Sequence, residues 1–129
     1  MRHTVLVIDD QWSMQELARI VLRAAGYRVL LANDVVTGLC LARTEHPDIT
    51  VLDVSLTEDT RYAFLDNLRQ DTTTAMFPLL LISTTPTTDH LLASLPTGMA
   101  SCLQKPFRPP ELLTMVDRLL RHDDMPIAV

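Results

Sequence analysis

The stretch TVLVIDD, from Thr4 to Asp10, joins a short apolar run to two carboxylates. Four more apolar runs of four residues each follow along the chain, at 28–31, 49–52, 79–82 and 100–103. Most of these runs lack alternating polar side chains, which is typical of strands that are covered on both faces of a sheet. The sequence therefore predicts five buried strands, the first of them from Thr4 to Ile8.

A stretch of helical period separates the first two runs. Ser13 and Glu16 have the spacing of a capping box at the start of this helix, and Gly26 is placed to end it. The apolar residues between them recur at spacings of three and four, which is the stripe of an amphipathic helix. They are Met14, Leu17, Ala18, Val21, Leu22 and Ala25.

The other predicted helices cover residues 35–43, with Asp34 as N-cap, then 62–69, 88–95 and a last segment that opens with Pro109-Pro110. Five strands thus alternate with five helices. This alternation favours an α/β fold of the doubly wound (βα)5 type, with a five-stranded parallel sheet, right-handed crossovers and helices on both faces. The predicted fold has three layers.

The size of the chain fits one domain with a single core, because 129 residues leave no room for a second catalytic domain. We expect this domain to cover residues 1–121, and residues 122–129 to be a C-terminal tail or the start of a linker. Acidic residues exceed basic ones by 16 to 11. The resulting net charge of −5 argues against direct nucleic-acid binding by this chain.

No apolar run approaches the roughly 18 residues of a membrane span, so neither an anchor nor a signal peptide is expected. Cys40 and Cys102 lack the spacing of a disulfide framework or a metal site, and we expect both to be small core residues. These features indicate a reducing, cytoplasmic location and no membrane partner.

The chain has three glycines, Gly26, Gly38 and Gly98, and no two are close enough to form a glycine-rich phosphate loop or a serine-hydrolase elbow. Its four histidines are scattered, without the spacing of a zinc site. Phosphate or metal chemistry would therefore depend on other side chains.

Polar side chains follow the predicted strands at their carboxyl ends, where the loops of a doubly wound sheet converge and ligands bind. They are Asp9, Asp10, Asp53, Ser83 and Lys105. Three close carboxylates repel one another unless cations intervene. Lys105 is the only lysine among eleven basic residues and supplies one positive charge. A Mg²⁺ ion, which prefers carboxylate, water and phosphoryl oxygens, could supply the remaining positive charge. The sequence therefore predicts a phosphoryl site built from a metal ion and side chains.

Four segments carry a family resemblance: Asp9-Asp10, Val51-Leu52-Asp53, Ile82-Ser83 and Lys105-Pro106-Phe107. In this order and at these separations they resemble the receiver domain of two-component response regulators, such as the chemotaxis regulators, over about residues 2–121. The resemblance implies a flavodoxin-like sheet of strand order 2-1-3-4-5. It also implies that Asp53 is the phosphoacceptor, which takes a phosphoryl group from a phosphohistidine of a sensor histidine kinase or histidine phosphotransfer protein.

The resemblance further implies a role for each neighbouring residue. Asp10, Asp53 and the backbone carbonyl of Ser55 would hold Mg²⁺, with Asp9 acting mostly through water. Lys105 would pair with the phosphoryl oxygens. The Ser83 hydroxyl would move to hydrogen-bond them and so act as a switch. The output would be a changed surface that a downstream effector protein or a fused output domain recognises. A homodimer is also compatible with the resemblance. The domain would be a phosphorylated signalling module and not an enzyme.

Several positions depart from the family pattern. Leu56, Thr57 and Arg61 stand in the loop after the acceptor, where the family usually has Met, Pro and Gly. We therefore expect residues 54–60 to have their own conformation. Cys102 stands where the family has an aromatic switch residue, so we predict an output that depends less on this side chain.

Ser55 and Thr85 would flank the path of the water that hydrolyses the acyl phosphate. Neither side chain offers a carboxylate or an amide to orient that water. The sequence therefore suggests the hypothesis that autodephosphorylation is slow.

Other functions fit parts of the pattern. A pseudo-receiver, an interaction module that signals without phosphorylation, would explain the altered loop and the missing aromatic residue. An aspartyl-phosphate phosphohydrolase normally has a second Asp two places after the nucleophile, where this chain has Ser55. A flavin-binding relative ranks lower, because Asp9-Asp10 would repel the phosphate of a mononucleotide. Trp12 is expected to pack over the rim of the site.

Overall fold

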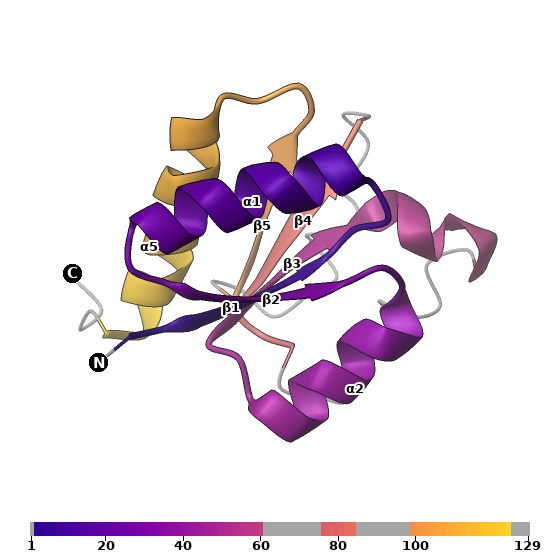
Figure 1. Cartoon of the computed structure of the whole chain (residues 1–129), viewed down its shortest axis with the longest axis horizontal. Helices are drawn as coiled ribbons and strands as arrows, with labels where there is room; N and C mark the ends of the chain where they lie inside the picture. Colours follow the sequence, from indigo (N-terminus) through magenta and orange to yellow (C-terminus); the bar gives the residue numbers. More distant parts are fainter. Residues whose placement is uncertain (1, 61–75, 85–98, 125–129) are drawn as a thin grey trace.

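The computed structural model describes residues 2–60, 76–84 and 99–124, which build a five-stranded parallel sheet in the order β2-β1-β3-β4-β5 (Figure 1). The strands are β1 (Thr4–Ile8), β2 (Arg28–Ala32), β3 (Ile49–Asp53), β4 (Leu79–Ser83) and β5 (Ala100–Gln104). The helices are α1 (Trp12–Ala24), α2 (Val35–Glu45), α5 (Pro109–Asp124) and the 3₁₀-helix η1 (Val54–Thr60). The predicted strand order is confirmed.

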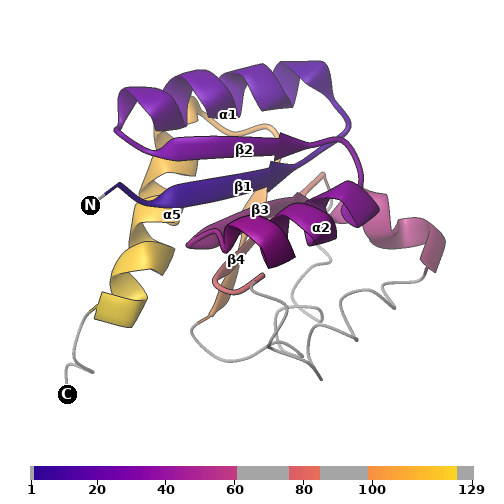
Figure 2. The ribbon, with the colours of Figure 1, turned by 60° about the horizontal axis from the view of Figure 1, so that its bottom comes forward.

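Helices cover both faces of this sheet, α1 and α5 on one face and α2 on the other (Figures 1 and 2). Alternate side chains of β1 therefore enter different cores. Val5 and Val7 pack with residues of α1 and α5, whereas Leu6 and Ile8 pack with Ala42 of α2. The three-layer arrangement follows from strands that are buried on both sides, as the apolar runs predict. The predicted helices at 62–69 and 88–95 lie outside the described residues.

Four strands run one residue beyond their predicted ends, to Ala32, Asp53, Ser83 and Gln104. The Asp9 N–H donates to the Ala32 carbonyl at 3.0 Å, and the Lys105 N–H donates to the Ser83 carbonyl at 2.7 Å. Asp53 and Ser83 are themselves the last residues of β3 and β4. The sheet therefore fixes the backbone of these polar residues directly.

The start of α1 differs from the prediction. The helix begins at Trp12 with Gln11 as N-cap, and no side-chain bond caps it. The capping box from Ser13 to Glu16 does not form, since the Glu16 carboxylate pairs instead with Arg19 at 2.6 Å. The physical reason lies one turn earlier: the Asp9 carboxylate accepts the Gln11 N–H at 2.8 Å and turns the chain into the helix before Ser13.

Gly26 follows the end of α1, as predicted. Its φ of 95° lies in a region that side-chain-bearing residues rarely adopt, and its N–H donates to the Arg23 carbonyl at 2.9 Å.

The start of α2 is confirmed, because the Asp34 side chain accepts the Thr37 N–H at 2.7 Å. The helix continues two residues past the predicted 43, to Glu45. Its buried residues are Gly38 and Ala42, one turn apart on the side that faces the sheet. Cys40 lies between them on the helix and is exposed, so its prediction as a core residue is wrong. Cys102, in β5, is half-buried, and the two cysteines form no disulfide.

Gly38 packs closely against Ile8, the last residue of β1. A Cβ atom built on Gly38 would lie 2.6 Å from Cγ1 and 3.3 Å from Cγ2 of Ile8, whose side chain is fully buried. The absence of a side chain at position 38 thus lets α2 approach the strand that leads directly into Asp9.

Long-range polar contacts join the elements at the amino ends of the strands. The Thr4 N–H donates to Asp48 Oδ2 at 2.6 Å. The Tyr27 hydroxyl donates to the Asp117 carboxylate of α5, and the Tyr27 ring stacks on His3 with centroids 6.4 Å apart. The predicted site lies at the other ends of the strands, their carboxyl ends.

The last helix, α5, opens with Pro109-Pro110 as predicted and ends at Asp124, three residues beyond position 121. Residues 125–129 lie outside the described part of the chain. Within the described residues, no helix combines the length and the apolar character needed to cross a membrane.

Candidate functional site

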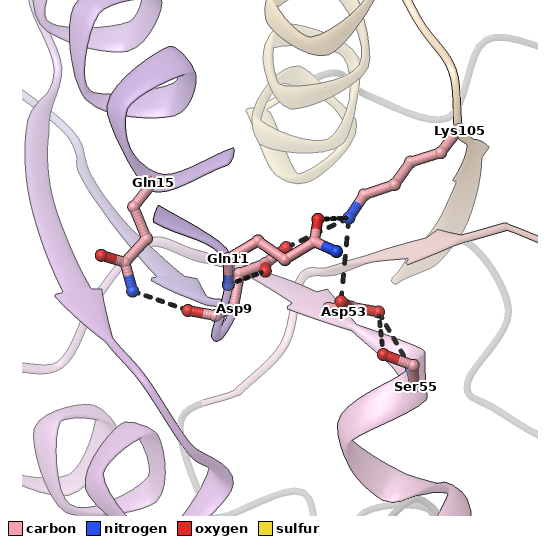
Figure 3. Close-up of polar contacts among 6 residues, drawn as sticks. All are labelled: Asp9, Gln11, Gln15, Asp53, Ser55 and Lys105. Atoms are coloured by element: carbon pink, nitrogen blue, oxygen red, sulfur yellow. Dashed lines mark hydrogen bonds and ion pairs between the residues drawn. The ribbon is translucent and has the colours of Figure 1, made fainter. Parts of the chain in front are cut away.

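The polar residues that follow the strands meet at one edge of the sheet (Figure 3). Asp9 comes directly after β1, Asp53 ends β3, and Lys105 follows β5. One carboxylate oxygen from each of Asp9, Asp10 and Asp53 lies within 4.8 Å of the others. Because neighbouring parallel strands have their carboxyl ends on the same side of the sheet, the fold brings together Asp9 and Asp53, which are more than forty residues apart in the sequence.

Asp9 is the most buried of the three acids, with 1% of its surface exposed. Its Oδ1 accepts the Gln11 N–H, whereas its Oδ2 is buried without a hydrogen bond from the described residues, 3.5 Å from the Lys105 Nζ. Burial raises the pKa of the Asp9 carboxyl, and the charge of Asp53 adds to this, although the Gln11 N–H and Lys105 act in the opposite direction. The ionised Asp9 carboxylate therefore lowers the free energy of unfolding at neutral pH. This destabilisation becomes smaller as the pH falls through the pKa that Asp9 has in the folded protein.

Asp53 is also buried, and its two carboxylate oxygens have different surroundings. Oδ1 accepts two hydrogen bonds from Ser55, one from the backbone N–H at 3.0 Å and one from the hydroxyl at 2.9 Å. Oδ2 faces the Lys105 Nζ at 3.8 Å. One oxygen of Asp53 is thus held by the loop that follows β3, and the other is turned toward a positive charge.

Lys105 reaches over this cluster from β5 with 17% of its side chain exposed. Its Nζ donates a hydrogen bond to Gln11 Oε1 at 3.0 Å, in addition to its ion pairs with the two acids (Figure 3). Ser83, whose carbonyl anchors the Lys105 backbone, is buried at the end of β4, next to the register partner of Asp53. The predicted gathering of three carboxylates and an ammonium group is confirmed, and Ser83 lies beside them in the sheet.

Two glutamines, which no sequence motif indicated, also take part in this network. Gln11 contacts Lys105, and the Gln15 amide donates to the Asp9 carbonyl at 2.6 Å and to Asn33 Oδ1 at 2.5 Å. Their position just after the acidic pair is the one signal that could have drawn attention to them. Trp12, in contrast, is 74% exposed, so its predicted packing over the rim is wrong.

Residues 54–60, after Asp53, form the 3₁₀-helix η1. Thr57 is buried, and its hydroxyl donates to the Val54 carbonyl at 2.7 Å, which ties the turn to its own backbone. The Thr57 hydroxyl thus closes a local bond where the family usually has a proline, which cannot donate.

The acidic residues could hold a hard divalent cation. Their donors are all oxygen atoms, which Mg²⁺ prefers, and the distances between them suit a shared ion that also keeps water ligands. Asp9 Oδ2 gives independent support, because a buried carboxylate oxygen without a hydrogen bond is costly unless a cation is bound nearby. The residues present therefore fit the predicted metal.

The sequence model of the family described as "Response regulator receiver domain" matches residues 5–117. The chain therefore belongs to the receiver domains of two-component response regulators. The acidic cluster at the carboxyl ends of the strands lies within this match.

Several named regulators are similar to this chain over most of its length. The DNA-binding dual master transcriptional regulator RpaA of Synechocystis is 33% identical over 120 residues, which are 93% of this chain and 50% of RpaA. The alkaline phosphatase synthesis transcriptional regulatory protein PhoP of Bacillus subtilis is 33% identical over 97% of this chain and 51% of its own length. The chain thus spans about half the length of the curated relatives it matches.

Solved structures show the same fold. The chemotaxis response regulator CheY4 of Vibrio cholerae superposes with a TM-score of 0.78 and 26% identity, over 92% of this chain and 99% of that one. A signal receiver domain from Bermanella marisrubri has a TM-score of 0.75 at 24% identity, over 93% and 99% of the two chains. The flavodoxin-like fold expected from the resemblance is confirmed.

Proposed function

We propose that this receiver domain is a phosphorylation-dependent switch in which Asp53 accepts a phosphoryl group from a phosphohistidine. The observation that carries the proposal is the environment of Asp53: a buried carboxylate whose free oxygen faces the only lysine of the chain, beside two further acids that could hold a metal. A carboxylate attacks as a nucleophile in its ionised form.

In the proposed reaction, Asp53 Oδ2 attacks the phosphorus atom, because Oδ1 is engaged by Ser55. The new P–O bond forms as the P–N bond to the donor imidazole breaks, and the imidazole nitrogen keeps the bonding electron pair. Transfer of this kind depends on positioning and on neutralising the phosphoryl oxygens. Lys105 supplies a compact positive charge for those oxygens, and the Ser83 hydroxyl a neutral donor.

A bound Mg²⁺ would neutralise charge on the phosphoryl oxygens and on the acids at once. Asp10, Asp53 and the backbone carbonyl of Ser55 are the proposed ligands, and Asp9 acts mostly through a water molecule. Asp9 Oδ2 is an available acceptor for that water, because it has no hydrogen bond within the described residues.

The proposed output is a change of surface. Phosphorylation adds about 1.5 to 2 negative charges, by analogy with other phosphorylated residues, which is enough to draw the Ser83 hydroxyl toward Asp53 and bias a two-state loop. Cys102, half-buried in the neighbouring strand, takes the place of the usual aromatic residue, so we expect its side chain to transmit little of this change.

The proposed partners follow from the family and the relatives. A sensor histidine kinase or a histidine phosphotransfer protein would donate the phosphoryl group. A downstream effector protein or a fused output domain would read it; RpaA is named as a DNA-binding regulator, whereas this chain, with a net charge of −5, is not expected to contact DNA itself. The lack of a disulfide between Cys40 and Cys102 suits a cytoplasmic location.

The proposal is tested by incubating the protein with Mg²⁺ and a small phosphodonor such as acetyl phosphate, followed by intact mass. We expect a single alkali-labile phosphoryl adduct that is absent from Asp53→Asn and from samples treated with a chelator. An unmodified protein that still binds its partner would instead support a pseudo-receiver. Continuous turnover of phosphate esters would support a phosphohydrolase.

A further inference from the structure

The contacts of the Lys105 ammonium are uneven. Its shortest contact is with a neutral group, Gln11 Oε1 at 3.0 Å, whereas Asp9 Oδ2 and Asp53 Oδ2 lie at 3.5 and 3.8 Å. A close charge-assisted hydrogen bond between an ammonium and a carboxylate measures about 2.7–2.9 Å. Lys105 is therefore hydrogen-bonded to an amide, although two carboxylates are within reach.

The Gln11 side chain makes no other hydrogen bond within the described residues. Its backbone performs the structural tasks at this position: the N–H binds Asp9 Oδ1, and the carbonyl accepts the Gln15 N–H at 3.1 Å to open α1. The side chain is exposed and does not cap the helix. Figure 3 shows it reaching from the start of α1 across to Lys105, on the side where the Asp53 carboxylate lies.

We propose that Gln11 is a positioning residue, which holds the Lys105 ammonium ready for the phosphoryl group and out of a tight ion pair with Asp9 or Asp53. This inference rests on the proposed function of Asp53 as phosphoacceptor. A neutral acceptor can orient an ammonium group without neutralising it. The charge of Lys105 thus stays available, and Asp53 Oδ2, 3.8 Å from Nζ, is not engaged in a close hydrogen bond with it.

Loss of the amide has a definite consequence. Without Gln11 Oε1, the nearest acceptor for Lys105 among the described residues is Asp9 Oδ2, which is buried and accepts no hydrogen bond from them. Lys105 would then move between that oxygen and Asp53 Oδ2, so its ammonium would be held less firmly and would form direct ion pairs with either carboxylate in turn. A direct ion pair there competes with both a metal ion and a phosphoryl group for the same carboxylates. Phosphorylation should therefore slow by about tenfold, the effect of losing one hydrogen bond to a charged group.

The contact can be measured without any phosphorylation, because Lys105 is the only lysine. Lysine-selective ¹³C and ¹⁵N labelling of the full chain gives one side-chain signal, whose order parameter reports how firmly the ammonium is held. We expect this order parameter to fall in Gln11→Met, which has a similar length and no acceptor oxygen. It should be retained in Gln11→Glu, where the oxygen remains.

Gln104→Met is the matched control, since Gln104 is exposed next to Lys105 in sequence and makes no hydrogen bond to it within the described residues. The same four proteins are then phosphorylated with acetyl phosphate and Mg²⁺ and followed by intact mass. A lower order parameter together with slower phosphorylation in Gln11→Met, with both unchanged in Gln104→Met, is the expected result.

Unchanged order in Gln11→Met, equal loss of order in Gln11→Glu, or lower order without slower phosphorylation would overturn the role of Gln11. An equal effect in Gln104→Met would overturn it as well. If the unaltered chain takes up no phosphoryl group, the proposed function fails, and Gln11 has no positioning role in phosphorylation. The order parameters then report only a structural contact.

Discussion

The Tyr27 hydroxyl donates a hydrogen bond to the Asp117 carboxylate, which joins the turn after α1 to α5 across 90 positions of sequence. Burial, the hydrogen bond and the charge of Asp117 together raise the pKa of Tyr27 from 10.0 to about 12. The bond therefore contributes to stability while the phenol is protonated, and this contribution falls as the pH rises from 10 toward 12.

We expect Tyr27→Phe to lower the free energy of unfolding by about 1 kcal/mol at neutral pH, because it leaves the half-buried Asp117 without its donor. Urea denaturation of both proteins measures the difference. It should shrink as the pH rises from 10 to 12, where the unaltered chain loses the same bond. A difference that stays constant over this range would contradict the assigned titration.

Gly38→Ala should destabilise the fold even though alanine is the better helix former. The gain in helix propensity is about 1 kcal/mol, whereas overpacking a buried site costs about 1–3 kcal/mol. The cost should exceed the gain here, because the new methyl group would meet Cγ1 of Ile8 at 2.6 Å and not only the mobile end of that side chain. Thermal denaturation should show a lower Tm.

The double variant Gly38→Ala with Ile8→Val provides the control. Removal of the Ile8 Cδ1 methyl relieves part of the overlap, so the two changes together should cost less than the sum of the single changes. Additive effects would mean that the two residues do not compete for the same space.

Asp9→Asn should stabilise the metal-free protein by about 1 kcal/mol, because it removes a buried charge that lies close to two other carboxylates. Mg²⁺ should raise the Tm of the unaltered chain and have a smaller effect on the variant. Calorimetric melts with and without Mg²⁺ measure both effects. An equal Mg²⁺ shift in the two proteins would remove Asp9 from the proposed metal site.

The phosphoryl group on Asp53 should be lost slowly, since neither Ser55 nor Thr85 can orient the hydrolytic water. A carboxylate or amide at these positions would supply that function, and a positioned general acid or base typically contributes about 10²–10⁴-fold. We expect Ser55→Asn combined with Thr85→Glu to shorten the half-life of the adduct by about tenfold, which is below that range because the two new side chains only orient the water. An unchanged half-life, measured by intact mass after removal of the donor, would count against the hypothesis.

Cys102→Ala should leave phosphorylation-dependent partner binding within about twofold of the unaltered protein, which corresponds to a change of about 0.5 kcal/mol in binding free energy. The comparison uses the cognate output partner and isothermal titration calorimetry. Abolished binding with intact phosphorylation would show that the thiol does transmit the switch.

Much of the fold could be predicted because its strands are buried on both faces, which leaves unmistakable apolar runs in the sequence. The site could be predicted because a parallel sheet brings the residues that follow those runs to one edge. The start of α1 could not, since the capping box at Ser13 was overridden by the Asp9 carboxylate, which accepts a backbone N–H two residues further on. Side-chain competition of this kind depends on the folded arrangement.

Other errors have similar causes. Cys40 is apolar by residue type, but the positions that face the sheet on α2 are those of Gly38 and Ala42. The contact from Lys105 to Gln11 spans 94 positions and joins residue types that are common on any surface, so no spacing in the sequence indicates it. The predicted roles of Ser55, Ser83 and Cys102 remain predictions, and the predicted helices at 62–69 and 88–95 lie outside the described residues.

The hydrogen bond from Thr4 to Asp48 lies at the amino ends of β1 and β3, whereas Asp53 is at the carboxyl end of β3. Strands of five residues measure roughly 16 Å from end to end. That is about two Debye lengths at physiological salt. A dye, affinity tag or surface tether attached near Asp48 would therefore leave the electrostatic potential around Asp53 almost unchanged, which makes this end of the sheet the natural place for immobilising the protein in biosensor work.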